Sequence, residues 1–285
     1  MNILLLGAQG QLGSAIQHCF AGNQSLIVPQ SRVDITDASA VADCINISRP
    51  DVVINTAAYT QVDLAETEKD QAFAVNELGV INLIKAVDDS TRIIHVSTDF
   101  VFNGEQKTPY TPDSPTDPLG IYGVSKRAGE IALLEHHASA VILRTSWLYA
   151  PWLKNFVMTM LNLMESRDSL NIVNDQQGCP TSVLSLANVI SLMAEQENAH
   201  GIYHWADQGI VSWYDFACEI QKQAYALGLL TDKIPLNPIK TEGYPTPAKR
   251  PAYSALDCSK TEQLLQIKRA PWQDELQKVL RMIQR

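Results

Sequence analysis

The sequence has 285 residues, of which 46% are hydrophobic and 19% charged, a composition typical of a globular protein with a sizeable core. Acidic residues outnumber basic ones by 31 to 22, and the net charge of -9 argues against a nucleic-acid-binding protein. The 5 cysteines lack metal-ligand or redox spacing, which predicts free thiols in a reducing compartment. The first apolar run is too short for a signal peptide and none approaches a membrane span, so we expect a cytoplasmic protein without membrane contact.

The chain begins with a predicted strand, a glycine turn and a predicted helix. Ile3–Leu6 is a continuous apolar run, typical of a parallel strand covered on both faces. Gly7, Gly10 and Gly13 follow, and helical periodicity then continues to Phe20. Glycines let the backbone approach a pyrophosphate closely, and a helix N-terminus supplies N–H groups and partial positive charge. This order predicts dinucleotide binding, the alternative being a plain turn between a strand and a helix.

A second short strand is predicted over Leu26–Val28, and Ser31 and Arg32 follow it. Sites that prefer NADH usually place a carboxylate at the end of this strand, whereas an arginine accommodates the 2′-phosphate of NADPH. No acid stands there, so the sequence favours NADPH and leaves NADH possible; the alternative is a loop arginine without a ligand. Asp34 is placed to lie at the adenine side of the cofactor, and a helix is predicted over residues 38–48.

Two further buried strands are predicted at Asp51–Asn55 and Arg92–Ser97. Ala57 and Ala58 follow the first strand, and such small residues would let a flat ligand lie against the backbone. Thr98 follows the second strand. Because ligands of open α/β sheets bind beyond the carboxyl ends of the strands, we expect the site at this edge.

Other polar residues are interpreted as structural. His95 lies inside a predicted strand, which favours a packing residue over a catalyst. Asp63, Glu66, Glu68 and Asp70 fall mostly in the early turns of a predicted helix, where the helix dipole favours acids. We therefore expect these four acids on a solvated face.

Tyr122 and Lys126 are four residues apart in a segment that is predicted to begin a helix. This spacing places them on one helix face, and a cation beside a phenol lowers its pKa. Taken alone, the pair also fits a half-exposed tyrosine above a solvated lysine. The glycine turn and the polar strand ends favour a proton donor beside a dinucleotide.

After a strand predicted over Val141–Thr145, the alternation of strands and helices becomes less regular. We expect a Rossmann-type doubly wound parallel sheet in residues 1–146 as an α/β NAD(P)-binding domain. Residues 147–285 are expected to form a smaller, mostly helical substrate-binding part, from which the chain could cross back into the first domain. Its helices are predicted near residues 156–167, 184–195, 213–226 and 272–283.

Several motifs, taken in order, resemble the extended short-chain dehydrogenases/reductases. They are the turn Gly7–Gly13, Asn55–Tyr59, Ser97–Asp99 with Val101 and Phe102, and Tyr122 with Lys126. Further segments narrow the resemblance to the dTDP-4-dehydrorhamnose reductase family: Arg144–Trp147, Asp175–Gly178 with Pro180 and Thr181, and Tyr244–Pro247 with Arg250 and Pro251. The resemblance runs along the whole chain. It implies reduction, with NAD(P)H, of the 4-keto group of dTDP-4-dehydro-6-deoxy-L-mannose to dTDP-L-rhamnose.

The resemblance also implies a role for each site residue. Tyr122 would donate the proton, Lys126 would lower its pKa and bind the nicotinamide ribose, and Thr98 would polarise the ketone. Ser97 is the substitute for Thr98, although it should point to the other side of the strand. The cofactor would lie on Gly7, Gly10, Gln11, Leu12, Ser31, Arg32, Asp34, Ile35, Ala57, Ala58, Tyr59, Tyr122 and Lys126. The substrate would lie on Thr98, Asp99, Asn155, Thr181, Arg250 and the apolar wall of Trp147; for Arg250 the alternative is a surface ion pair.

The sequence departs from the family at two positions. Some members hold magnesium at a dimer interface with two glutamates, which correspond to Ala15 and Leu184 here. Neither side chain supplies an oxygen for a hard cation. We therefore predict no metal, and either a monomer or a homodimer that no metal bridges.

Two rival functions remain. One is a reductase or epimerase of another nucleotide sugar, since the residues of the second part decide the substrate. The other is a non-catalytic NADP-binding regulatory subunit, which the same fold also provides. The presence of Thr98, Tyr122 and Lys126 argues against the second rival.

Overall fold

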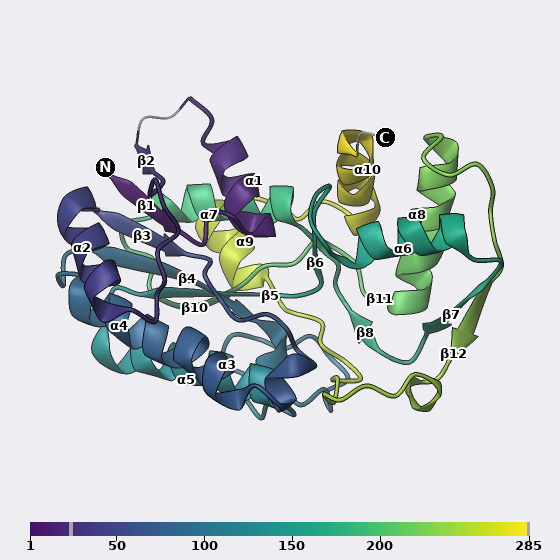
Figure 1. Ribbon diagram of the computed structural model, residues 1–285, viewed down its shortest axis with the longest axis horizontal. Coiled ribbons are helices and arrows are strands. Elements are labelled where there is room, and N and C mark those ends of the chain that lie inside the picture. Colours follow the sequence, from purple (N-terminus) through teal and green to yellow (C-terminus); the bar gives the residue numbers. More distant parts are fainter. Residues whose placement is uncertain (23–24, 284–285) are drawn as a thin grey trace.

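The computed structural model describes residues 1–22 and 25–283 and is built around a six-stranded parallel sheet (Figure 1). The strand order is β10-β5-β4-β3-β1-β2. The strands are β1 (Ile3–Leu6), β2 (Leu26–Ile27), β3 (Val52–Asn55), β4 (Arg92–Thr98), β5 (Val141–Thr145) and β10 (Gly201–His204). The order reverses between β1 and β3, where a crevice for ligands opens at the carboxyl ends. The predicted doubly wound Rossmann-type sheet is confirmed.

Helices cover both faces of this sheet, which explains the continuous apolar runs of the strands. Within β1, Ile3 and Leu5 pack into one hydrophobic cluster and Leu4 and Leu6 into another on the opposite face. In Figure 1 one set of helices lies above the sheet and the other below it. The first set is α1 (Gln11–Cys19), α7 (Val183–Ala194) and α9 (Ser259–Leu265); the second is α2 (Ala38–Ser48), α4 (Gly79–Ala86) and α5 (Ile121–His136).

The segment between β3 and α4 differs from the single helix that we predicted. It contains a 3-10 turn η1 (Leu64–Glu66), α3 (Lys69–Phe73) and a π-helical turn η2 (Ala74–Leu78). The expectation of a wholly solvated acidic face is wrong here. Asp63 forms an ion pair with Arg250, and the Glu66 carboxylate accepts a 2.9 Å hydrogen bond from the Ile121 N–H at the start of α5.

The second part, to the right in Figure 1, has its own hydrophobic core. Its helices are α6 (Phe156–Ser166), α8 (Trp213–Ala226) and α10 (Trp272–Met282), and a 3-10 turn, η4 (Thr241–Gly243), follows its last strand. Its short strands form two-stranded sheets: β6 (Leu148–Tyr149) with β9 (Thr181–Ser182), β7 (Leu170–Val173) with β12 (Leu236–Ile239), and β8 (Gln177–Gly178) with β11 (Val211–Ser212). The chain returns to the central sheet through α7 and β10. Residues 1–146 alone therefore do not complete the sheet.

Nothing in the described ranges 1–22 and 25–283 offers a helix both long and apolar enough to cross a lipid bilayer.

Candidate active site

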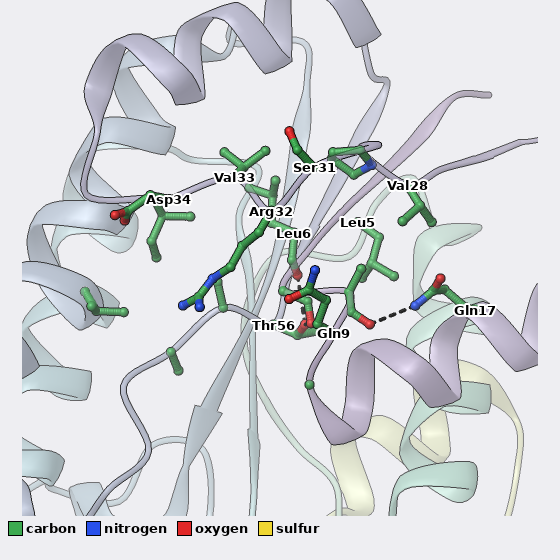
Figure 2. A pocket seen from close by; sticks show the side chains of 18 of the residues that line it. Leu5, Leu6, Gln9, Gln17, Val28, Ser31, Arg32, Val33, Asp34 and Thr56 are labelled. Atoms are coloured by element: carbon green, nitrogen blue, oxygen red, sulfur yellow. Dashed lines mark hydrogen bonds between the residues drawn. The ribbon is translucent and has the colours of Figure 1, made fainter. Parts of the chain in front are cut away.

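A cavity of about 510 Å³ opens at the carboxyl ends of β1 and β3, at the point where the strand order reverses (Figure 2). Eight of the residues predicted at the cofactor line it: Gly7, Gly10, Ser31, Arg32, Asp34, Ile35, Ala57 and Ala58. The cavity also has lining residues that the sequence analysis missed, among them Gln9, Gln17, Val28, Thr56 and Val75. Thr56 could have been found, because it directly follows a predicted strand.

The floor of this cavity depends on glycines. Gly7 has a φ of +77°, and a Cβ on it would lie 2.5 Å from the Ala57 nitrogen. A Cβ on Gly13 would collide with the Gly7 carbonyl oxygen. In the described structure no side chain caps α1, and its first turn holds no acid, so its N-terminal N–H groups face the cavity mouth without a competing carboxylate. This arrangement suits the pyrophosphate of a dinucleotide.

Arg32 extends from the loop after β2 into the cavity, as Figure 2 shows. Asp34 is held in its own turn, where one carboxylate oxygen accepts hydrogen bonds from the Thr36 N–H at 2.9 Å and the Thr36 hydroxyl at 2.8 Å. These bonds lower the pKa of Asp34. Val28, the residue directly after β2, also lines the cavity, and no acid stands at the end of this strand.

Thr98 ends β4, and Tyr122 lies in the first turn of α5 beside it. The Tyr122 hydroxyl interacts with the side chain of Thr98, whose own hydroxyl donates to Asp99 Oδ1 at 3.2 Å. The Phe100 ring packs edge-on against Tyr122 with centroids 5.5 Å apart. Burial raises the pKa of Tyr122 to about 12; the interaction with Thr98 lowers it and the nearby Asp99 carboxylate raises it. The phenol therefore keeps its proton at neutral pH, as a proton donor must.

Lys126 lies one turn further along α5, and only 2% of it is exposed. Its Nζ donates to the Val96 carbonyl oxygen at 2.8 Å and lies 3.2 Å from His95 Nε2. Burial lowers the pKa of Lys126 to about 8, against a raising effect of Glu130. In this structure the Lys126 amine points to the sheet, and burial dominates the pKa of the phenol. That Lys126 lowers the pKa of Tyr122 when the cofactor is bound stays a prediction.

Polar atoms without partners collect at the carboxyl ends of β4 and β5. Among the described residues, Asp99 Oδ2 and Thr145 Oγ1 are buried without a hydrogen bond. Thr145 pairs with Thr98 in the sheet, so both side chains lie on one face, whereas Ser97 pairs with Arg144 on the other. Burial raises the pKa of Asp99 to about 6. Such unsatisfied groups call for a polar ligand at this edge.

Trp147 is held in an unusual backbone conformation beside the same edge. Its φ is +46°, in the left-handed region that non-glycine residues rarely adopt. Its indole stacks on Trp213 with ring centroids 3.5 Å apart, and a Cβ on Gly178 would lie 2.6 Å from it. Trp213, the first residue of α8, was missed from the sequence because only the folded chain brings it to Trp147.

Comparison with known proteins places this site in a family. The model of the RmlD substrate binding domain matches residues 1–285. The chain belongs to this family. A dTDP-4-dehydrorhamnose reductase from Aggregatibacter actinomycetemcomitans is 41% identical, with 98% of each chain covered. The predicted family resemblance is confirmed, and so is the predicted enzyme class, an NAD(P)H-dependent oxidoreductase.

Solved structures agree over the full length. The crystal structure of a dTDP-4-dehydrorhamnose reductase from Clostridium acetobutylicum is 38% identical and covers 100% of both chains, with a TM-score of 0.92. A dTDP-4-dehydrorhamnose reductase from Bacillus anthracis, solved in complex with NADP, is 34% identical over 98% of this chain and 99% of the other, with a TM-score of 0.90.

Five residues predicted at the cofactor do not line the cavity: Tyr122 and Lys126, described above, and Gln11, Leu12 and Tyr59. The Leu12 side chain is buried in the core, so only its backbone N–H could reach a phosphate. The Gln11 carbonyl accepts a 3.2 Å bond from Trp152 Nε1, and its side chain reaches the Lys154 carbonyl. Tyr59 binds Asn76 through its backbone and Glu68 through its hydroxyl.

Three residues predicted at the substrate have other partners. Asn155 caps α6 by accepting from the Met158 N–H, and its Nδ2 donates to nearby carbonyls, so its amide is used locally. Thr181 is fully buried in β9. Arg250 forms a two-bond ion pair with Asp63, at 3.1 and 2.8 Å, which is the surface ion pair that the sequence left as the alternative. Their substrate contacts stay predictions that this geometry does not favour.

The two positions that differ from the metal-binding members hold apolar side chains in the structure as well. Ala15, on α1, is buried in the hydrophobic cluster that contains Ile3 and Leu5. Leu184 packs against that cluster and against the core of the second part. Residues 1–22 and 25–283 contain no group of three or more metal-ligating side chains. The absence of a metal requirement and the oligomeric state both stay predictions.

Proposed function

We propose that this oxidoreductase transfers hydride to the 4-keto group of dTDP-4-dehydro-6-deoxy-L-mannose and so forms dTDP-L-rhamnose. The names of the relatives support this substrate. Each relative compared above is named a dTDP-4-dehydrorhamnose reductase, and each matches this chain over nearly its whole length. The observation that carries the chemistry is that Thr98, at the end of β4, lies beside Tyr122, in the first turn of α5, at the carboxyl edge of the sheet. Both hydroxyls could reach one ketone oxygen there.

In this proposal Tyr122 is the general acid. When bound, the reduced nicotinamide supplies the hydride. The developing alkoxide would take the Tyr122 proton, and the Thr98 hydroxyl would polarise the ketone beforehand. The high pKa of Tyr122 keeps the donor protonated before reaction. Lys126, once it turns from His95 to the nicotinamide ribose, would bring a positive charge toward the phenol and lower that pKa during the reaction.

The rest of the edge would hold the sugar. Asp99 Oδ2 and Thr145 Oγ1 are buried acceptors and donors that sugar hydroxyls could satisfy. Trp147 and Trp213 would form an apolar wall beside them. We therefore add Thr145 and Trp213 to the proposed substrate-binding residues, because of the unbonded Thr145 hydroxyl and the stacking of Trp213 on Trp147.

NADPH is proposed as the preferred cofactor, with NADH also accepted. Arg32 reaches into the cavity, and its guanidinium suits the oxygens of a 2′-phosphate. Val28 stands where an NADH site would place a carboxylate. The Bacillus anthracis relative was solved with NADP, which supports a cofactor of this kind.

The test is turnover of NADPH with dTDP-4-dehydro-6-deoxy-L-mannose, followed by the loss of reduced-nicotinamide absorbance. Tyr122→Phe should slow turnover about 10²- to 10⁴-fold, the usual contribution of a general acid, and leave NADPH binding nearly unchanged. Tyr214→Phe is the matched control, because Tyr214 lies on α8 and packs against the core of the second part. No turnover by the wild type, with or without magnesium, would refute the function; normal turnover by Tyr122→Phe would remove it from the mechanism.

A reductase of another deoxy-keto sugar is the rival that one relative favours. A protein from Streptomyces antibioticus named as a probable dTDP-4,6-dihydroxy-2-methyloxan-3-one 4-ketoreductase is 36% identical over 90% of this chain. Competition between the two dTDP-keto sugars in one assay decides between them. The larger kcat/KM identifies the substrate.

A further inference from the structure

His95 lies at the centre of a buried hydrogen-bond chain that the proposed mechanism does not use. Its side chain is fully buried. Its Nδ1 lies 3.1 Å from Asn55 Nδ2, and its Nε2 lies 3.2 Å from Lys126 Nζ. Burial, followed by the nearby Lys126 charge, holds the pKa of His95 well below its usual value. The imidazole is therefore neutral and offers one N–H donor and one acceptor nitrogen.

Asn55 decides which groups donate and which accept along this hydrogen-bond chain. The Ala57 N–H donates to Asn55 Oδ1 at 3.1 Å, so the amide NH₂ group faces His95 and donates to Nδ1. An imidazole that accepts at Nδ1 carries its proton on Nε2. That N–H points at Lys126 Nζ, which can accept it only as a neutral amine. A neutral Lys126 amine still donates to the Val96 carbonyl oxygen at 2.8 Å, so every group in the chain is satisfied.

An ammonium at Lys126 requires the opposite direction. An ammonium has only donors, so His95 Nε2 must accept from it and the imidazole proton must move to Nδ1. Asn55 must then turn its carbonyl oxygen toward His95. The Ala57 N–H loses its acceptor in this second state. Because Ala57 lines the cofactor cavity, that N–H becomes available to a ligand there.

We propose that His95 is a positioning residue that couples the charge of Lys126 to the Asn55–Ala57 turn of the cofactor cavity. The inference rests on the proposed role of Lys126 at the cofactor, and it does not depend on which sugar is reduced. A cofactor oxygen that accepts from the Ala57 N–H favours the second state and therefore the ammonium. Cofactor binding is then accompanied by proton uptake.

The surroundings of Lys126 leave His95 and Glu130 as the titratable groups that act on it. Glu130, on α5 itself, raises the pKa of Lys126 while burial lowers it to about 8. Other charged groups on the elements around α5 have different partners: Arg127 and Arg144 form ion pairs with Glu130, Asp99 lies near Tyr122, and Glu66 accepts from the Ile121 N–H. Lys69, Asp70 and Lys85 are exposed at the surface.

The experiment is calorimetric titration of the full chain with NADPH near pH 8, in two buffers of different ionisation enthalpy. The difference between the two apparent enthalpies gives the number of protons taken up. At a pH equal to the pKa of Lys126 in the free protein, the wild type should take up as much as about half a proton. His95→Leu should bind NADPH without taking up protons, because leucine breaks the hydrogen-bond chain between Lys126 and Asn55.

Two further variants make the test specific. His204→Leu removes another fully buried imidazole of the same sheet, bonded to the Tyr110 carbonyl and outside the chain, and should keep the wild-type uptake. Asn55→Ala removes the other end of the hydrogen-bond chain and should also lose the proton uptake. This variant keeps the proposal testable if circular dichroism shows that His95→Leu does not fold. No uptake by the wild type, or wild-type uptake by the folded variants, overturns the coupling. Failure of turnover would instead contradict the proposed function and leave this result unchanged.

Discussion

Replacing Gly7 by alanine should weaken NADPH binding at least tenfold, because two separate costs meet at this residue. Its φ of +77° costs an L-residue roughly 1–2 kcal/mol. In addition, the new Cβ would lie 2.5 Å from the Ala57 nitrogen, about 0.9 Å inside the 3.4 Å at which ordinary van der Waals contact begins. The atom it meets is backbone, so relief requires movement of the turn after β3, with a cost of about 1–3 kcal/mol.

Gly228→Ala separates the two costs. Gly228 follows α8 with a φ of +73°, and nothing lies within 4 Å of a Cβ built on it. This variant should therefore lose only the roughly 1–2 kcal/mol of the left-handed conformation. Gly7→Ala should lose about 2–5 kcal/mol in the free energy of unfolding, the sum of the conformational and packing costs.

The assays are urea unfolding, followed by circular dichroism, and NADPH titration of the folded protein, followed by cofactor fluorescence. A tenfold loss of affinity corresponds to about 1.4 kcal/mol, which is less than the cost of about 2–5 kcal/mol expected at a turn that forms the floor of the cofactor cavity. Equal NADPH affinities for Gly7→Ala and Gly228→Ala would refute the close approach of backbone and cofactor at this turn. Equal losses of stability would refute the packing term.

Three further outcomes follow from the described contacts. Arg32→Ala should reduce the affinity for NADPH about 10- to 100-fold and leave that for NADH nearly unchanged, in parallel titrations, because only NADPH carries the 2′-phosphate. Glu130→Ala leaves the buried Arg144 without its carboxylate, bound at 2.9 and 2.7 Å, and should cost about 3–5 kcal/mol in urea unfolding; Glu219→Ala, which breaks an exposed pair, should cost no more than about 1 kcal/mol. Burial raises the pKa of Asp207 to about 7 from an ordinary 3.8, so the stability it contributes at low pH is lost as the pH rises through that range. Asp207→Asn should therefore be more stable than wild type at pH 8, by up to about 4 kcal/mol, and show no such advantage below about pH 4; equal pH profiles in urea unfolding would contradict the buried carboxyl.

The parts of the fold that depend on neighbouring residues were predictable from the sequence. Helix α2 has the predicted bounds because Asp37 accepts from the Ser39 and Ala40 N–H groups at its start, and Arg49 takes a left-handed conformation at its end. The buried strands were predictable because both faces of a parallel sheet are covered and the runs are apolar throughout. The glycine turn followed from the same local order of strand, turn and helix.

Contacts between distant residues were not predictable in this way. Asp63 and Glu66 looked like solvated acids by their helix positions, and their partners Arg250 and Ile121 stand 187 and 55 residues away. Strand β10 joins the sheet beside β5 only because the chain returns from the second part. No pattern among neighbouring residues predicts that a later segment will pair with an earlier strand.

Tyr122 and Lys126 show why helical spacing alone does not fix the position of a charge. Four residues along a helix place two Cα atoms on one face, but a long side chain can carry its charge elsewhere. Lys126 extends beneath the sheet edge to Val96 and His95, while the Tyr122 hydroxyl stays at Thr98. The pKa of the phenol is therefore set by its own burial, and the lysine gains influence over it only by leaving His95. In the proposed mechanism, an event that turns Lys126 from His95 toward the phenol would lower the pKa of Tyr122, and His95 would then act on the proton donor through the partner that it offers to Lys126.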